Sequence, residues 1–241
     1  CALPIWFVLA NCAPEHLQTL LGEPPTTSAL GGQLKVNMLL NKLPRLRSGV
    51  DPAVAFAGTF HLNESYDQLQ QAYAQAKAGQ IPQRIPAEMY CHSLTDPSIL
   101  SPALSEQGYH TLTLFALQMH ASLFEHDHDL RKKQVLHQVL AELNEHLLDP
   151  IETCLAKDAH GQPCLEAKTP QELELDLGLP GGHIFHGELS MPFREDNEPE
   201  SWGVETAHDR LFICGAGAVR GGGVSGIAGH NAAHAVLEQL P

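Results

Sequence analysis

The chain is poor in basic residues, with 14 Lys and Arg against 28 Asp and Glu among 241 residues, which gives a formal net charge of -14. Nucleic acids and anionic membrane surfaces bind clusters of Lys and Arg. The longest basic run is Arg131-Lys132-Lys133. We therefore expect neither nucleic acid nor an anionic membrane surface as a partner.

Long apolar runs and regularly spaced cysteines are also missing. A membrane-spanning helix needs about 18 or more consecutive apolar residues, and the sequence has no such run. The 6 cysteines show no CxxC spacing, which argues against a small disulfide framework and against a zinc ribbon. These absences predict no transmembrane segment, reduced thiols and a cytoplasmic protein.

The composition that remains, 43% hydrophobic and 17% charged, is typical of one large or two small globular domains. Predicted helices and strands alternate without strict βα order, so we expect an α/β or α+β fold with a mixed sheet. Ser65–Ala78 and Asp129–Leu148 have helical periodicity, and Tyr109–Met119 alternates like a strand. Val54–Phe60 is predicted as a further strand, and Thr169-Pro170-Gln171-Glu172 as a capping box that starts a helix.

A glycine-rich segment near the C-terminus is the most informative feature. An apolar strand is predicted over Leu211–Cys214, glycines dominate Gly215–Gly223, and a helix is predicted over Val224–Leu240. Glycine lets the backbone approach a bulky anionic ligand, and a helix N-terminus supplies free N–H groups. The pattern indicates a cofactor site, and the alternative is a glycine-rich turn before a closely packed helix.

Several nucleotide and catalytic motifs do not fit this segment. No Lys follows the glycines, as a P-loop requires. Gly221, Gly223 and Gly226 satisfy GxGxxG, but no second strand follows as a primary dinucleotide fingerprint requires. Ile227 stands where the nucleophile elbow around Ser225 would need a glycine. The main fingerprint of the cofactor is therefore expected elsewhere.

At this point the residues resemble a known family. Phe212–Ala233 is similar to the C-terminal FAD-binding motif of the phytoene desaturase and carotene isomerase branch of flavoproteins. Within that branch, the likeness is to the group of pyridine nucleotide-disulfide oxidoreductase domain-containing proteins. Val8-Leu9-Ala10-Asn11, Gly58–Leu62 and Gly181–Gly187 have counterparts there, so the resemblance covers nearly the whole chain.

The resemblance implies part of an FAD-dependent oxidoreductase whose N-terminal FAD-binding part is missing from this chain and would act in cis. Residues 1–32 would end a Rossmann-like FAD-domain segment, 33–190 would form the substrate domain, and 191–241 would return to the FAD domain. The reaction would be hydride transfer from an apolar or amphipathic small-molecule substrate to the flavin. Alone, the chain is expected to bind FAD weakly or not at all.

The resemblance also implies roles for the glycine segment. Gly215 and Ala216 would lie along the ribityl and pyrophosphate portion of FAD. The N–H groups facing the flavin N1/O2 edge would come from Gly222, Gly223, Val224, Ser225 and Gly226. Reduced flavin is negative at that edge, so a helix N-terminus there is stabilising. Ala218-Val219-Arg220 departs from the family pattern, so the resemblance does not identify the substrate.

His186 is the candidate catalytic residue, because it lies in Gly181–Gly187, a loop that the resemblance places near the flavin. A histidine there can donate a hydrogen bond or move a proton near neutral pH. The alternative is a histidine that only holds the loop backbone.

Two other functions remain as alternatives. The first is a non-enzymatic flavoprotein relative that serves as a protein-interaction module. The second is a metal-binding module around His126 and His128, in the run Glu125–Asp129 near His120. Because such a run is typical of a solvated turn, we predict no metal site there.

Overall fold

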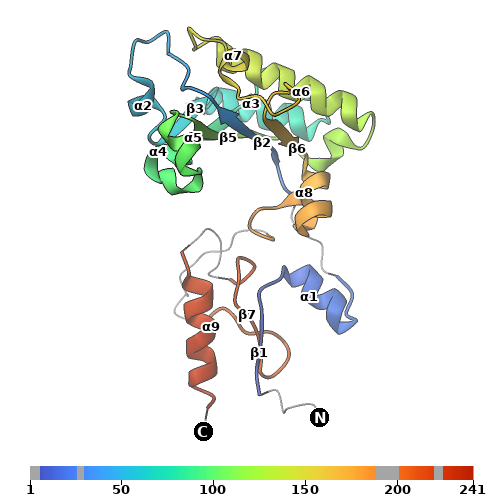
Figure 1. Cartoon of the computed structure of the whole chain (residues 1–241). Coiled ribbons are helices and arrows are strands. Elements are labelled where there is room, and N and C mark those ends of the chain that lie inside the picture. Colours follow the sequence, from blue (N-terminus) through green and yellow to red (C-terminus); the bar gives the residue numbers. More distant parts are fainter. Residues whose placement is uncertain (1–5, 26–29, 188–200, 220–224, 241) are drawn as a thin grey trace. The chain divides into compact units, whose positions relative to one another are not determined.

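The computed structural model of the chain describes residues 6–25, 30–187, 201–219 and 225–240. These residues divide into two compact units (Figure 1). The terminal unit combines the chain up to Gly31 with the chain from Leu173 onward, and the central unit runs from Gly32 to Glu172.

The central unit contains a five-stranded sheet in the order β3-β4-β5-β2-β6. Its strands are β2 (Gln33–Leu40), β3 (Thr59–Leu62), β4 (Ala87–Tyr90), β5 (His110–Leu117) and β6 (Leu165–Lys168). Every pairing is antiparallel. The α+β class is thus confirmed, whereas the sheet is antiparallel instead of mixed. Alternation of buried and half-exposed residues along β2 and β5 fits this result, because parallel strands are usually buried on both faces.

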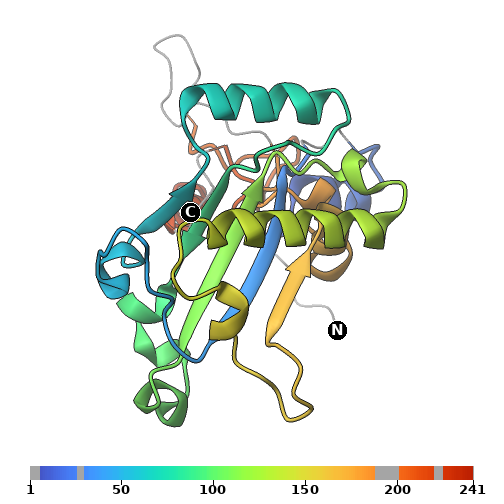
Figure 2. The ribbon, with the colours of Figure 1, turned by 90° about the horizontal axis from the view of Figure 1, so that it is seen from above.

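One face of this sheet carries the main core of the central unit. Val36, Leu114 and Met89 are fully buried on it. Helices α3 (Tyr66–Lys77) and α6 (His128–Asn144) lie across this face (Figure 2). Both helices were predicted and are confirmed. The opposite face of the sheet is half-exposed along β2 and β5.

Short helices complete the central unit: α2 (Pro52–Ala55), α4 (His92–Thr95), α5 (Pro102–Glu106), α7 (Ile151–Cys154) and the start of α8 (Pro170–Leu177), with 3-10 turns η1 (Pro97–Ile99) and η2 (Ala121–Phe124). The strand predicted over Val54–Phe60 is wrong except at its last two residues. Asp51 caps α2 by accepting the Ala53 N–H at 2.8 Å, and Pro52 suits the first helical turn. The strand begins only at Thr59.

The predicted capping box that starts α8 is confirmed. The N–H of Thr169 donates to Glu172 at 2.9 Å, and the N–H of Glu172 donates to the Thr169 hydroxyl at 3.3 Å. Lys132 of α6 donates to both Glu172 oxygens at 2.7 Å. The start of α8 is thereby fastened to α6.

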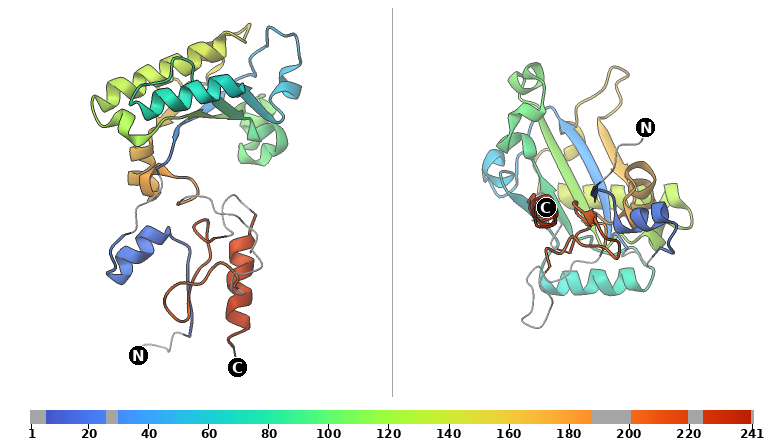
Figure 3. Two further views of the ribbon diagram at one scale, coloured as in Figure 1. Left: turned by 180° about the vertical axis from the view of Figure 1, so that it is seen from behind. Right: turned by 90° about the horizontal axis from the view of Figure 1, so that it is seen from below.

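The terminal unit is built differently. Its strands β1 (Val8–Ala10) and β7 (Leu211–Ile213) pair in parallel, with Leu9 opposite Phe212. Its other elements are α1 (Pro14–Leu21), the rest of α8, the 3-10 turn η3 (Pro180–Gly182) and α9 (Ile227–Leu237). Figure 3 shows β1 beside β7 and the C-terminal helix α9 near them. Small apolar clusters around Phe212 and Leu17 form its core.

No helix in the part of the chain that the structure describes is both long enough and apolar enough to cross a membrane. The five described cysteines, at positions 12, 91, 154, 164 and 214, are free thiols.

Candidate functional site

The turn after β7 is held against the end of β1. The N–H of Cys214 donates to the Ala10 carbonyl at 2.9 Å, which continues the parallel pairing. The N–H of Ala218 then returns to the Gly215 carbonyl at 3.1 Å. Gly215 and Ala216 therefore lie in a tight turn at the carboxyl end of two parallel strands, which is where ligands bind in open α/β sheets.

Two glycines of this turn leave no room for a side chain. A β-carbon on Gly215 would lie 2.1 Å from the Asn11 Oδ1 atom. A β-carbon on Gly217 would lie 2.4 Å from the Pro14 Cδ atom. The Asn11 side chain could rotate away, but the Pro14 ring could not, so the turn depends on glycine most clearly at Gly217.

Helix α9 starts without a side-chain cap. Its first flanking residue, Gly226, has φ 75° and ψ 0°, a left-handed conformation that favours glycine. Ser225 and Gly226 are exposed, and the Ser225 hydroxyl accepts the Ile227 N–H at 3.3 Å. The start of α9 thus presents helix-end N–H groups and their partial positive charge to solvent. Gly222, Gly223 and Val224 lie outside the described residues.

The buried face of α9 consists of small residues. Ala228, Ala232 and Ala235 are buried against the cluster around Phe212. A β-carbon on Gly229 would lie 3.8 Å from the Cys214 carbonyl oxygen, so helix and strand approach closely. Asn231 secures the helix by donating from Nδ2 to the Trp202 carbonyl at 2.9 Å.

His186 lies next to this turn. A β-carbon on Gly217 would be 3.6 Å from the His186 Cβ atom. His186 has φ 64°, which is uncommon for a residue other than glycine. Within the described residues, its Nδ1 atom is buried and has no hydrogen-bond partner. Burial lowers the pKa of His186, and the neighbouring His16 and His183 lower it further, so the imidazole is neutral at neutral pH.

The two neighbouring histidines bind loop backbone. His16 Nε2 is hydrogen-bonded to the Gly178 carbonyl at 2.8 Å, and His183 Nδ1 accepts the Phe185 N–H at 3.1 Å. His186 makes a backbone contact as well, since its own N–H donates to the His183 carbonyl at 3.0 Å. Its ring Nδ1 atom, however, has no hydrogen-bond partner among the residues that the structure describes.

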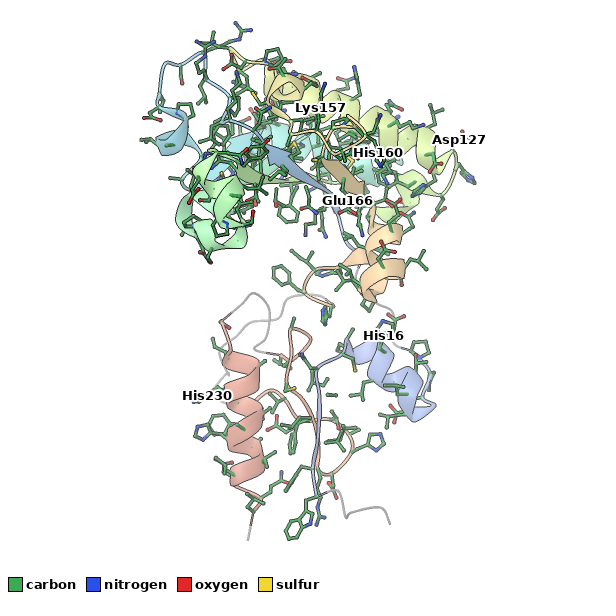
Figure 4. The ribbon with its side chains drawn as sticks, in the orientation of Figure 1. His16, Asp127, Lys157, His160, Glu166 and His230 are labelled. Carbon is green, nitrogen blue, oxygen red and sulfur yellow. The ribbon has the colours of Figure 1, made fainter. Side chains whose placement is uncertain are left out.

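The half-exposed face of the central sheet contains a cavity of about 490 Å³ that no sequence motif indicated. Polar side chains line it, and they include Asn37, Thr111, Thr113, Cys164 and Glu166. Asn37 donates to Glu166 at 3.4 Å and accepts from the Thr113 hydroxyl at 3.3 Å. Figure 4 shows Glu166 on β6. In the sequence, the alternation of Thr111 and Thr113 with leucines is the signal that could have indicated a polar face here.

The acidic and histidine-rich run ahead of α6 is mainly exposed, including His126 and Asp127. His128 is the exception, because its Nε2 atom is hydrogen-bonded to the Thr169 hydroxyl at 3.0 Å. This histidine therefore has a structural partner at the start of α8.

No known protein-family profile matches the chain. The chain is 50% identical over 240 residues to the Mycobacterium tuberculosis strain H37Rv protein named uncharacterized protein Rv0897c, an alignment covering 97% of this chain and 45% of that protein. It is 32% identical over 215 residues to pyridine nucleotide-disulfide oxidoreductase domain-containing protein 2 of Rattus norvegicus, covering 86% and 35%. The corresponding Mus musculus protein is 30% identical over 214 residues, with the same coverage.

The chain spans less than half the length of these relatives. Over most of its own length it is a distant homologue of pyridine nucleotide-disulfide oxidoreductase domain-containing protein 2, which points to an oxidoreductase-like family.

Proposed function

We propose that the chain is part of an FAD-dependent oxidoreductase of the phytoene desaturase type, with the flavin held by the terminal unit. The observation that carries the proposal is the strand–turn–helix of β7 and α9. It combines a glycine turn at the carboxyl end of parallel strands with an uncapped, exposed helix start. Both features suit the close approach of an anionic cofactor.

The residues present fit a flavin in their chemistry. Gly215 and Ala216 offer backbone N–H groups without bulk to the ribityl and pyrophosphate portion. Ser225 and Gly226, with Gly222, Gly223 and Val224, would hold the N1/O2 edge at the start of α9. The buried Nδ1 atom of His186 lacks a hydrogen-bond partner among the described residues, and a bound polar group would satisfy it.

When bound, flavin would accept a hydride from a C–H bond of the substrate. The start of α9 would stabilise negative charge with its N–H groups and partial dipole charge. His186, kept neutral by its lowered pKa, would accept or donate one hydrogen bond at Nδ1 without adding charge. His186 remains a candidate for moving a proton in this reaction.

The terminal unit also supports the proposal that its two strands belong to a larger FAD-binding sheet. Val8 and Leu9 are nearly half exposed, although parallel sheets normally have both faces covered. Paired strands as short as β1 and β7 are marginal as an independent sheet. Further strands carrying the dinucleotide fingerprint would complete the sheet and supply most of the FAD affinity.

The cavity on the central sheet is the proposed substrate surface. It combines polar groups with apolar Leu39 and Leu165, a mixture that suits an amphipathic molecule. Thr111 Oγ1 is buried and, within the described part of the chain, has no hydrogen-bond partner. A polar group of the substrate would satisfy it.

The cofactor assignment is tested by titrating the isotopically labelled chain with FAD and following amide signals by NMR. We expect weak binding that shifts the signals of residues 215–219 and 225–230. Gly226→Asp should abolish these shifts, because its carboxylate repels an anionic ligand at the start of α9. Asp tolerates the left-handed backbone better than most residues, and circular dichroism of the variant checks that α9 remains folded.

Gly79→Asp is the matched control. Gly79 and Gly226 both have φ 75°, and at either position an added β-carbon would meet no atom within 4 Å. Gly79→Asp should bind FAD like the parent chain. Shifts confined to residues outside 215–219 and 225–230, or equal shifts in Gly226→Asp, would contradict the proposal and favour the interaction-module alternative. Stoichiometric flavin in the purified chain would instead contradict only the expectation of weak binding.

A further inference from the structure

A second cluster of polar side chains lies on the edge of the central sheet, separate from the cavity. It consists of His61 on β3, Glu64 just beyond β3, and Glu88 on β4. One potential metal-ligand atom from each of the three lies within 4.8 Å of the others. No sequence motif pointed to these residues.

Strand register and one turn bring the three side chains together. His61 and Glu88 are direct partners in the antiparallel β3–β4 ladder, so their side chains share one face at close range. Asn63 has φ 54°, and the chain turns there so that Glu64 reaches back to His61. Glu64 Oε2 is hydrogen-bonded to His61 Nδ1.

Glu88 is held in place from its own strand. The Tyr90 hydroxyl donates to Glu88 Oε2 at 2.6 Å. Hydrogen bonds of this kind orient carboxylates that bind metals. Tyr90 is thus a positioning residue for the cluster.

The cluster has an unbalanced charge. The Glu64 side chain is only 15% exposed, and its Oε1 atom is buried with no hydrogen-bond partner among the residues described. A buried carboxylate oxygen beside a second carboxylate is costly unless a cation or a proton compensates it.

We propose that His61 Nδ1 and one carboxylate oxygen each from Glu64 and Glu88 bind a divalent metal ion of the zinc class. An imidazole nitrogen with carboxylate oxygens is a donor set that zinc uses in proteins, and three protein ligands leave a position for water. Two carboxylates balance the charge of the ion. The His61 side chain is 51% exposed, which gives the ion a path from solvent.

A bound ion would fasten the turn after β3 to β4. The site lies within the central unit and does not depend on the flavin proposal. Its readouts are metal affinity and thermal stability, which are independent of any redox activity.

The experiment is calorimetric titration of the metal-free 241-residue chain with zinc chloride, together with melting curves with and without zinc. We expect a 1:1 component of micromolar affinity and a higher melting temperature with zinc. Glu64→Gln and Glu88→Gln should each weaken this component at least tenfold. Circular dichroism of the metal-free variants checks that they remain folded.

His208→Ala is the matched control, because His208 pairs with Glu23 at 2.6 Å and that pair belongs to no three-ligand group among the residues described. It should keep the 1:1 component. The proposal is wrong if zinc gives no such component, or if Glu64→Gln and Glu88→Gln bind zinc as tightly as the parent. Equal loss in His208→Ala would also overturn it, because the zinc would then be bound elsewhere.

Discussion

The two units of this chain show how differently a sheet can be supported. The central unit has five strands, one buried face and helices α3 and α6 over that face. Among its described residues, the terminal unit has two parallel strands of three residues each, and Val8 and Leu9 on β1 are nearly half exposed. A closed core is therefore a property of the central unit, whereas the terminal unit has the features of a site that needs further structure.

This difference suits the proposed roles. A rigid sheet with one covered face can present a binding surface on the other. The turn at Gly215 and Gly217 packs closely against the segment that follows β1. This packing buries few apolar side chains, so it depends on the surrounding elements to hold it in place. The comparison predicts that the central unit is the more stable of the two.

Leu114→Ala tests this comparison with the largest expected effect. Leu114 is fully buried in the middle of the sheet, and such a truncation costs about 2–5 kcal/mol of unfolding free energy. Trp6 and Trp202 are the only tryptophans, and both belong to the terminal unit. Urea unfolding should therefore show a shifted circular-dichroism transition and an unchanged tryptophan-fluorescence transition.

Leu175→Ala, at a position 84% exposed, is the control and should shift neither transition. If both transitions move together in Leu114→Ala, the units unfold as one and the comparison fails.

Glu142→Ala tests the polar support of the central unit. Glu142 is buried on α6 and accepts the Ile85 N–H at 3.0 Å and the Gln138 amide at 3.0 Å, as well as a hydrogen bond from Asn63. Removing the carboxylate leaves the buried Ile85 N–H unpaired, which costs about 1–3 kcal/mol, whereas Gln138 and Asn63 keep other acceptors. The midpoint of the circular-dichroism transition should therefore move to a lower urea concentration.

Glu145→Ala is the comparison variant, because Glu145 forms an exposed pair with Arg84. Exposed pairs contribute about 0–1 kcal/mol. Equal losses in the two variants would show that burial of Glu142 is unimportant.

Gly217→Ala tests the terminal unit by itself. The added methyl group would overlap Pro14, and overpacking of this kind costs about 1–3 kcal/mol. The fluorescence transition should shift, whereas the circular-dichroism signal should change only in the part that α1 and α9 contribute. Gly187→Ala, where no atom lies within 4 Å of the added carbon, should leave both unchanged. If the fluorescence transition of Gly217→Ala does not shift, the turn is loosely held.

His186→Asn tests pH dependence and has the smallest expected effect. The pKa of His186 is lowered in the folded chain, mainly by burial. The unfolded chain therefore binds the proton more readily, and the terminal unit should lose stability as the pH falls below about 6.5. Asparagine tolerates the left-handed backbone of this position. The variant His186→Asn should therefore fold and show a smaller pH dependence in unfolding followed by fluorescence.

The control for this prediction is His137→Asn, at an exposed position on α6. It should leave the pH dependence of the terminal unit as it is in the parent chain. An unchanged pH dependence in His186→Asn would refute the assignment of the effect to His186.

Local structure was largely predictable from the sequence. The helix predicted over Ser65–Ala78 forms as α3, and the structure adds a capping box between Ser65 and Gln68 at its start. The helical periodicity of α6 is likewise confirmed, since Val139, Leu140 and Leu143 are buried. The apolar run Val54–Phe60 favours a strand, but the capping of Asp51 and the proline at position 52 start the helix α2 there instead. At the candidate site, the sequence indicated the strand, glycine turn and helix, but not the cavity or the group of His61, Glu64 and Glu88.

The sequence by itself thus determined where most helices and strands form and where the backbone needs glycine, because these properties depend on neighbours a few residues away. Only the tertiary structure decided that β1 pairs with β7, that Gly217 meets Pro14, and that His61 faces Glu88. Strand pairing and register depend on the burial of side chains far apart in the chain, and no local pattern specifies that.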